Sequence, residues 1–219
     1  MAPLHLLITA GPTHEPIDQV RFIGNRSSGR LGVALADEAA RRGHRVTLLL
    51  GPVALLPADP AVSLHRFRTT SDLDTLMSAH VPACDALIMA AAVADFRPRL
   101  LQRPDAAAGK IKRGDQPLVL ELEPTPDLLA KAASLRATSQ LFVGFALEPR
   151  DRLRESALSK LERKDLDMVV ANPLETMDAD TIDATVFCRD GSSVQTDGPI
   201  LKSQFAGWLL DVVQAARRR

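Results

Sequence analysis

The sequence predicts an α/β fold with a doubly wound, mostly parallel β-sheet, and three observations support this prediction. Short apolar segments alternate with amphipathic segments of helical length through most of the 219 residues. Several apolar segments are hydrophobic throughout, as expected of strands that are covered on both faces. Near the C-terminus, two strand-like segments flank Asp190-Gly191, which is typical of a β-hairpin. Because βαβ units are right-handed, this alternation predicts a Rossmann-like sheet with helices on both faces and a C-terminal β-hairpin.

The expected elements follow from the apolar patterns and from the residues that bound them. Strands are expected at residues 4–9, 45–50, 62–67, 86–91, 118–122, 141–146 and 168–171, with the hairpin at 184–189 and 193–196. Helices are expected at residues 28–43, 70–79, 151–164 and 202–217, with another opening at 125. We interpret residues 1–219 as a single domain, to which the hairpin and the terminal helix (182–219) are appended.

Helix caps and long connections complete the prediction. Ser28 is the expected N-cap of the first helix, and Thr125 is the expected N-cap of the helix in which Pro126 and Asp127 form the first turn. Residues 11–28 form a long glycine- and proline-containing loop, a kind of loop that is more often functional than passive. Residues 92–114 are expected to be a mobile loop at the C-terminal edge of the sheet.

Composition excludes several classes of function. The formal net charge is +0, so bulk electrostatic attraction to nucleic acid or to a membrane surface is not expected. No apolar run approaches the roughly 18 residues of a membrane span, and the N-terminus does not resemble a signal peptide. Cys84 and Cys188 form no paired motif, and the five histidines lack metal-ligand spacing. We therefore expect a cytoplasmic protein with neither a nucleic-acid nor a membrane partner.

Residues 21–32, with the sequence RFIGNRSSGRLG, are the first candidate site. They lie between a strand and a helix, where the N–H groups near Ser28 and Gly29 can bind a phosphate or carboxylate. Arg21 can form a bidentate pair with such an anion, and the Asn25 amide can stabilise a developing oxyanion. A plain capped turn remains an equally good interpretation of the spacing alone. Neither a Walker motif nor a GxGxxG fingerprint occurs.

Three further groups could carry chemistry. Ala90, Ala91 and Ala92 end a central strand, where small side chains let a ligand approach the backbone, and Asp95 nearby suits a ribose hydroxyl or Mg²⁺. Lys110 could close over a triphosphate, although a solvated charge run is the usual meaning of the KIKR segment. Lys160 and Lys164 share one helix face, which is most often surface but could also place two donors on one ligand.

The chain resembles bacterial phosphopantothenoylcysteine synthetases in a series of motifs that keep the family's order over nearly the whole chain. These motifs are EPID (15–18), RFIGNRSSGRLG (21–32), AAAVADFRP (90–98), GKIKR (109–113), PDLL (126–129), VGFALE (143–148) and KLERKDLDMVVAN (160–172). The resemblance implies a magnesium-dependent ligase of coenzyme A biosynthesis. In that reaction 4′-phosphopantothenate attacks CTP to give an acyl-cytidylate and pyrophosphate, and L-cysteine then displaces CMP to form an amide.

The resemblance also implies roles for particular residues. Asn25 and Lys110 would be catalytic, Arg21, Asn25 and Ala92 would bind phosphopantothenate, and Asp95 or Asp127 would hold magnesium. The nucleotide site would comprise Ser28, Gly29, Met89, Ala90, Ala91, Asp95, Lys110, Pro126, Asp127, Phe145, Lys160 and Lys164. The family is homodimeric with an active site shared between subunits, and in many bacteria it is fused behind a flavin-dependent decarboxylase. No flavin is expected in this chain, and a decarboxylase is an expected partner.

Some features depart from the family pattern and keep alternatives open. Pro12 replaces a usual glycine, Thr125 replaces a usual asparagine, and the run from Ala146 to Pro149 is less polar than is usual. Residue types do not decide between CTP and ATP. A nicotinamide-dependent oxidoreductase on a related fold is one alternative, although it predicts an acidic residue where Gly51-Pro52 stands. A non-catalytic nucleotide-binding module is another.

Overall fold

An eight-stranded sheet forms the centre of the molecule. The structure is a computed structural model that describes residues 2–99, 109–177 and 179–217. The strands of the sheet are β1 (His5–Ala10), β4 (Arg45–Leu50), β5 (Ser63–Arg66), β6 (Ala86–Met89), β9 (Leu141–Glu148), β10 (Met168–Pro173), β12 (Thr185–Cys188) and β13 (Ser193–Gln195). Their spatial order is β13-β12-β10-β9-β6-β1-β4-β5. The six strands from β10 to β5 are parallel to one another. Strand β12 is antiparallel to β10, and β13 is antiparallel to β12. The parallel strands therefore have the Rossmann order, and the predicted fold class is confirmed.

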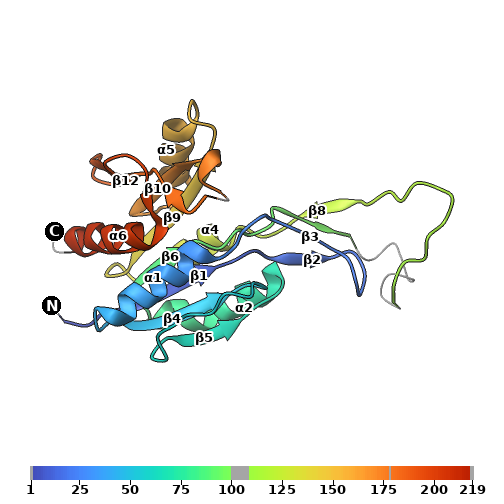
Figure 1. Cartoon of the computed structure of the whole chain (residues 1–219), viewed down its shortest axis with the longest axis horizontal. Coiled ribbons are helices and arrows are strands. Elements are labelled where there is room, and N and C mark those ends of the chain that lie inside the picture. Colours follow the sequence, from blue (N-terminus) through green and yellow to red (C-terminus); the bar gives the residue numbers. More distant parts are fainter. Residues whose placement is uncertain (1, 100–108, 178, 218–219) are drawn as a thin grey trace.

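Helices cover both faces of this sheet (Figure 1). One face packs against α1 (Arg30–Arg41) and α6 (Lys202–Ala216), and the other packs against α2 (Thr70–His80), α4 (Leu128–Ser134) and α5 (Leu153–Arg163). Alternate residues of β1 serve the two cores, since Ile8 faces α1 and α6 while Leu7 faces the opposite layer. None of these described helices is long and apolar enough to cross a membrane.

Two short ribbons extend from the sheet as an arm (Figure 1). One ribbon pairs β2 (His14–Pro16) with β3 (Phe22–Gly24), and the other pairs β7 (Phe96–Pro98) with β8 (Leu122–Pro124). The ribbons lie side by side through β2 and β7. Both chain ends lie at the opposite end of the molecule. We refer to β2, β3, β7, β8 and their connections (residues 13–24 and 95–124) as the arm.

The remaining elements are short and lie beside the sheet. They are the 3₁₀ helices η1 (Val81–Ala83) and η3 (Leu174–Thr176) and the paired strands β11 (Thr181–Ile182) and β14 (Ile200–Leu201). The C-terminal hairpin is continuous with the main sheet, because β12 pairs with β10, and α6 contributes Phe205 and Leu209 to the same core as α1.

Several local predictions were wrong. The first helix begins at Arg30, and its N-cap is Gly29 rather than Ser28. The helix expected to open at Thr125 begins at Leu128, and its N-cap is Asp127, whose carboxylate accepts a hydrogen bond from the Ala130 N–H. The Thr125 hydroxyl donates instead to the Ala94 carbonyl. Tertiary contacts have therefore displaced the caps by one or two residues from the positions that local propensity favours.

The two long connections differ from the expected loops. The loop expected at residues 11–28 contains the β2–β3 ribbon, because its residues pair with one another outside the main sheet. The strand expected at residues 118–122 lies at Leu122–Pro124 and belongs to the arm, where it pairs with β7. The loop expected at residues 92–114 is thus partly a strand, and its residues 100–108 lie outside the described residues.

Candidate functional site

The candidate site is a cavity of about 780 Å³ at the carboxyl ends of the central parallel strands. It opens where β1 and β6 lie side by side and their chain connections run to opposite faces, which is where ligands bind in doubly wound sheets. Most of the residues predicted for the site line this cavity: Asn25, Ser28, Gly29, Met89, Ala90, Ala91, Ala92, Asp95, Pro126, Asp127, Phe145, Lys160 and Lys164. Segments up to 140 residues apart in the sequence thus meet at one edge of the sheet.

The start of α1 forms one wall of the cavity. Gly29 has a φ of 72°, a left-handed conformation that glycine adopts without strain. Gly32 lies directly against β1, where an added Cβ would lie 3.1 Å from the Ala10 Cα and would collide with the Ala10 side chain. The first turn of α1 therefore lies close to the strand end and leaves helix N–H groups at the cavity wall. This arrangement provides an anion-binding helix start.

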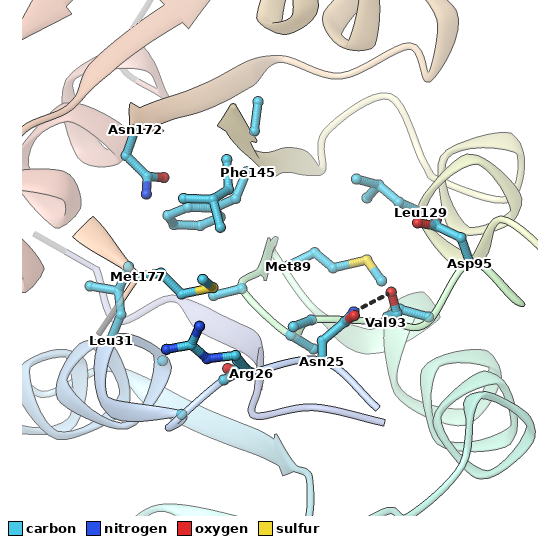
Figure 2. Close-up of a pocket in the computed structure, with 18 of the residues that line it drawn as sticks. Asn25, Arg26, Leu31, Met89, Val93, Asp95, Leu129, Phe145, Asn172 and Met177 are labelled. Atoms are coloured by element: carbon cyan, nitrogen blue, oxygen red, sulfur yellow. Dashed lines mark hydrogen bonds between the residues drawn. The ribbon is translucent and has the colours of Figure 1, made fainter. Parts of the chain in front are cut away.

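Asn25 joins this wall to the segment that follows β6. Its Nδ2 donates a hydrogen bond to the Val93 carbonyl over 3.0 Å, as Figure 2 shows. The side chain lies on the cavity lining with Arg26 beside it. An amide cannot accept a proton at neutral pH, so Asn25 suits orientation of a carbonyl or stabilisation of an oxyanion rather than general-base work.

Ala90, Ala91 and Ala92 line the cavity where β6 ends. Their N–H groups are already bonded: Ala90 to the Thr9 carbonyl, Ala91 to the Thr9 hydroxyl and Ala92 to the Gly11 carbonyl. A ligand that approaches these alanines would therefore meet N–H groups that already have a partner within the chain. Their small side chains remain important, because they leave space above the junction of β1 and β6.

A cluster of charged side chains lies at the far side of the cavity. Lys160 is half-buried and donates a hydrogen bond to the Phe145 carbonyl, while Lys164 forms an ion pair with Asp127 at 2.9 Å. Burial, followed by repulsion from Lys164, lowers the pKa of Lys160 to about 8. Burial alone would raise the pKa of Asp127, but hydrogen bonds from Lys164 and Ala130 outweigh it and lower that pKa. This side of the cavity therefore has two lysines, Lys160 and Lys164, but only Lys164 forms an ion pair with a carboxylate, that of Asp127.

Arg21 and Lys110 are the two predicted site residues that do not line the cavity. Both lie on the arm, where Lys110 is exposed. Arg21 forms an ion pair with Asp18 at 2.9 Å and donates to the Ile111 carbonyl. Within one subunit, the structure therefore does not bring these two residues to Asn25.

The cavity also includes residues that the sequence analysis did not select. Asn172 lies across the cavity from Asn25 and Arg26, near Phe145 (Figure 2), and its Nδ2 donates to the Thr176 hydroxyl over 2.7 Å. Lys202 lines the same region and donates to the Thr176 carbonyl over 2.9 Å. Asn172 could have been found from its position at the carboxyl end of the last parallel strand. Lys202 has no local signal, because it reaches the cavity only through the packing of α6.

Oxygen ligands for a magnesium ion are available at one side of the cavity. Asp95 is exposed and lines the cavity, whereas Asp127 is committed to Lys164 and to the cap of α4. Over residues 2–99, 109–177 and 179–217, three or more His, Cys, Asp or Glu side chains are nowhere grouped as a metal cluster. Mg²⁺ in nucleotide sites commonly uses only one or two carboxylates together with substrate phosphates. Asp95 fits that kind of site better than Asp127 does.

Comparison with known proteins gives a family match over nearly the whole chain. Residues 1–216 match the family model described as DNA/pantothenate metabolism flavoprotein C-terminal domain. Among curated relatives, the coenzyme A biosynthesis bifunctional protein CoaBC of Mycobacterium bovis is 41% identical over 204 residues, which is 88% of this chain and 48% of the relative. The CoaBC of Escherichia coli K12 is 37% identical over 94% of this chain and 50% of the relative.

A third relative has a different name, and solved structures share the fold. A protein of an unknown prokaryotic organism, named Cysteine/Cysteine sulfinic acid decarboxylase, is 48% identical over 78% of this chain and 46% of its own length. The chain thus spans about half the length of the curated relatives that it matches. The crystal structure of the C-terminal domain of CoaBC has a TM-score of 0.80 at 32% identity, covering 97% of this chain and 94% of that chain. The Streptococcus pneumoniae DNA/pantothenate metabolism flavoprotein has a TM-score of 0.81 at 28% identity, covering 97% and 99%.

Proposed function

The chain belongs to the DNA/pantothenate metabolism flavoprotein C-terminal domain family, and we propose that it is a ligase of coenzyme A biosynthesis that joins 4′-phosphopantothenate to L-cysteine. The cavity at the ends of β1 and β6 carries this proposal, since one wall is a helix start and the opposite wall has lysines. Such a cavity suits a substrate with several phosphates. The names of the CoaBC relatives support the pathway.

The first step activates the acid. A carboxylate oxygen of 4′-phosphopantothenate attacks the α-phosphate of CTP, the bond from the α-phosphate to the bridging oxygen breaks, and pyrophosphate leaves. The N–H groups at the start of α1 and the ammonium groups of Lys160 and Lys164 offset the phosphate charge. When the arm brings Lys110 to the cavity, its ammonium group adds positive charge during this step.

The second step forms the amide. The neutral amine of L-cysteine attacks the acyl carbon, the bond to CMP breaks, and the nitrogen loses a proton to solvent. Negative charge develops on the acyl oxygen, to which the Asn25 amide can donate its second Nδ2 hydrogen while the first stays on the Val93 carbonyl. Asn25 therefore acts mainly in the second step, and Arg21 and Ala92 contribute to binding of the acid.

Magnesium fits the proposed reaction. Asp95 would hold the ion with oxygens of the triphosphate, and Asp127 would keep its partner Lys164 in place. When bound, the ion supplies positive charge that neutralises the phosphates.

The arm supports a homodimer with a shared active site. It leaves about half of several large apolar side chains exposed: Val20, Phe22, Phe96, Leu118 and Leu122. Exposed apolar patches of this kind mark interfaces. A second copy that packs against the arm would receive Arg21 and Lys110 near its cavity, which explains why both residues lie outside the cavity of their own subunit.

The location and partner follow from the same reaction. The sequence has two cysteines, Cys84 and Cys188, which form no paired motif, and this suits the reducing cytoplasm where coenzyme A is made. The product carries the cysteine carboxylate, so a decarboxylase is the enzyme class that would consume it. The chain spans about half of relatives that are named bifunctional, and another relative is named a decarboxylase, which supports a decarboxylase as the partner.

A two-stage product assay tests this function. We expect pyrophosphate release from CTP that depends strictly on 4′-phosphopantothenate, followed by CMP release when L-cysteine is added. ATP in a parallel reaction decides the nucleotide, which residue types leave open. Nucleotide binding without either product would contradict the ligase and favour a non-catalytic nucleotide-binding module.

A further inference from the structure

The EPID motif at residues 15–18 contains a buried carboxylate that the proposed reaction does not use. Asp18 lies in the connection between β2 and β3 and is 4% exposed. Its Oδ1 accepts hydrogen bonds from the N–H groups of Val20, at 2.8 Å, and Arg21, at 2.7 Å. The carboxylate therefore fixes the turn from which the Arg21 side chain extends.

The second oxygen of Asp18 binds a distant segment. Oδ2 accepts a hydrogen bond from the Ile111 N–H over 3.0 Å and pairs with the Arg21 guanidinium over 2.9 Å. The same Arg21 group donates to the Ile111 carbonyl. Asp18, Arg21 and Ile111 thus form a closed set of contacts that we call the arm clamp.

The charge on Asp18 is required for this arrangement. Burial would raise the pKa of its carboxyl, but the N–H groups of Arg21, Val20 and Ile111 and the charge of Arg21 outweigh burial and lower it. The carboxylate is therefore ionised at neutral pH, and its hydrogen bonds are charge-assisted. An amide in its place has one acceptor oxygen, which cannot serve both the turn and the Ile111 N–H.

We propose that Asp18 is a positioning residue that holds the Lys110 segment and Arg21 together, so that both reach the same anionic substrate. This inference rests on the proposed function. Lys110 directly precedes Ile111, whose N–H and carbonyl are both bound in the arm clamp, so the clamp sets the position from which Lys110 extends. The clamp leaves the exposed ammonium group of Lys110 free to move toward a ligand.

Hydrogen exchange tests the clamp without any substrate. In Asp18→Asn, we expect the peptide that covers residues 109–116 to exchange about tenfold faster than in the wild type, because a charge-assisted hydrogen bond is lost. Peptides of β1 and β6 should be unchanged. The matched control is Asp37→Asn, since the Asp37 carboxylate also accepts two backbone N–H groups, from Ala58 and Asp59, but lies on α1 away from the arm. Equal exchange at residues 109–116 in Asp18→Asn and the wild type would overturn the clamp.

A double-mutant cycle then tests whether Asp18 acts through Lys110. We expect Asp18→Asn to lower kcat/KM for pyrophosphate release when Lys110 is present. In a Lys110→Gln background, the same substitution should lower kcat/KM much less. Asp37→Asn should have the same small effect in both backgrounds. If Asp18→Asn lowers kcat/KM by the same factor in both backgrounds, Asp18 only stabilises the arm. This result would overturn the positioning role. If the wild type releases no pyrophosphate, the ligase proposal fails, while the exchange result still supports or overturns the clamp.

Discussion

The amide of Asn25 donates to the carbonyl of Val93 over 3.0 Å and so joins two segments that are 68 residues apart. One segment leads from the arm into α1, and the other leaves β6. This bond sets the orientation of the only amide side chain that the sequence analysis assigned to the reaction centre. One N–H of the Asn25 Nδ2 group is held by the Val93 carbonyl, and the second N–H remains available to a ligand.

Asn25→Asp should separate the two steps of the proposed reaction. A carboxylate cannot donate to the Val93 carbonyl or to an oxyanion, whereas the two lysines that offset the triphosphate charge, Lys160 and Lys164, are still present. We expect pyrophosphate release to continue while CMP release slows by about 10²–10³-fold, the usual effect of losing an oxyanion donor. The acyl-cytidylate should then accumulate and be detectable by mass spectrometry. Equal slowing of both steps would contradict this role.

Lys110→Gln should slow mainly the first step. In the proposed reaction, the arm brings the ammonium group of Lys110 to the triphosphate, where it offsets negative charge. Loss of this ammonium group should therefore lower kcat/KM for pyrophosphate release. Lys112→Gln is the matched control, because Lys112 is exposed on the same segment. An unchanged first step in Lys110→Gln would show that this lysine is an ordinary surface charge.

Mixing two variants that are slowed in different steps should restore activity if the active site is shared. In a mixed dimer of Asn25→Asp and Lys110→Gln chains, one site combines an intact Asn25 with an intact Lys110 from the other subunit. After unfolding and joint refolding, about a quarter of the sites should be active if the symmetric dimer forms at random. Amide formation by the mixture is the measurement. No recovery, with mixed dimers confirmed by native mass spectrometry, would place both residues in the same subunit's site.

Nucleotide binding should weaken above about pH 8 because of Lys160. Its pKa of about 8 in the free protein means that Lys160 is charged at lower pH and becomes neutral as pH rises through this value. A bound triphosphate favours the charged form and raises this pKa, so binding above about pH 8 should take up a proton. Calorimetry in buffers of different ionisation enthalpy measures that uptake.

Lys160→Gln should bind CTP more weakly at neutral pH and should lose the additional weakening above about pH 8. Lys131→Gln is the control, because Lys131 is paired with Asp74 outside the cavity. The same pH dependence in Lys160→Gln and the wild type would exclude Lys160 as its origin.

Gly32→Ala should destabilise the fold and distort the phosphate-binding wall. An added Cβ would collide with the Ala10 side chain and push α1 away from β1. We expect the free energy of unfolding to fall by about 1–3 kcal/mol, which is typical of overpacking. Gly114→Ala is the control, since an added Cβ there meets nothing within 4 Å. Urea unfolding measures both, and equal stability of the two variants would contradict the close contact.

The parallel sheet and most of the cavity lining could be predicted from the sequence because both depend on local patterns. Buried strands read as continuous apolar runs, and right-handed connections then place their carboxyl ends at one edge. Residues near the carboxyl ends of such strands, including Ala92 and Asp95 after β6 and Phe145 within β9, are therefore expected to meet. Asn172 obeyed the same rule and could have been found by it.

The arm and the positions of its residues could be learned only from the tertiary structure. The arm forms because β2 pairs with β3 and β7 pairs with β8 outside the main sheet, a choice that local propensity does not specify. It separates Arg21 and Lys110 from the cavity and joins them through Asp18, across about 90 positions of the chain. Lys202 reaches the cavity only because α6 packs beside α1. The sequence alone determined the sheet and supplied the candidate site residues, whereas long-range packing determined which of these residues one chain brings together at the cavity.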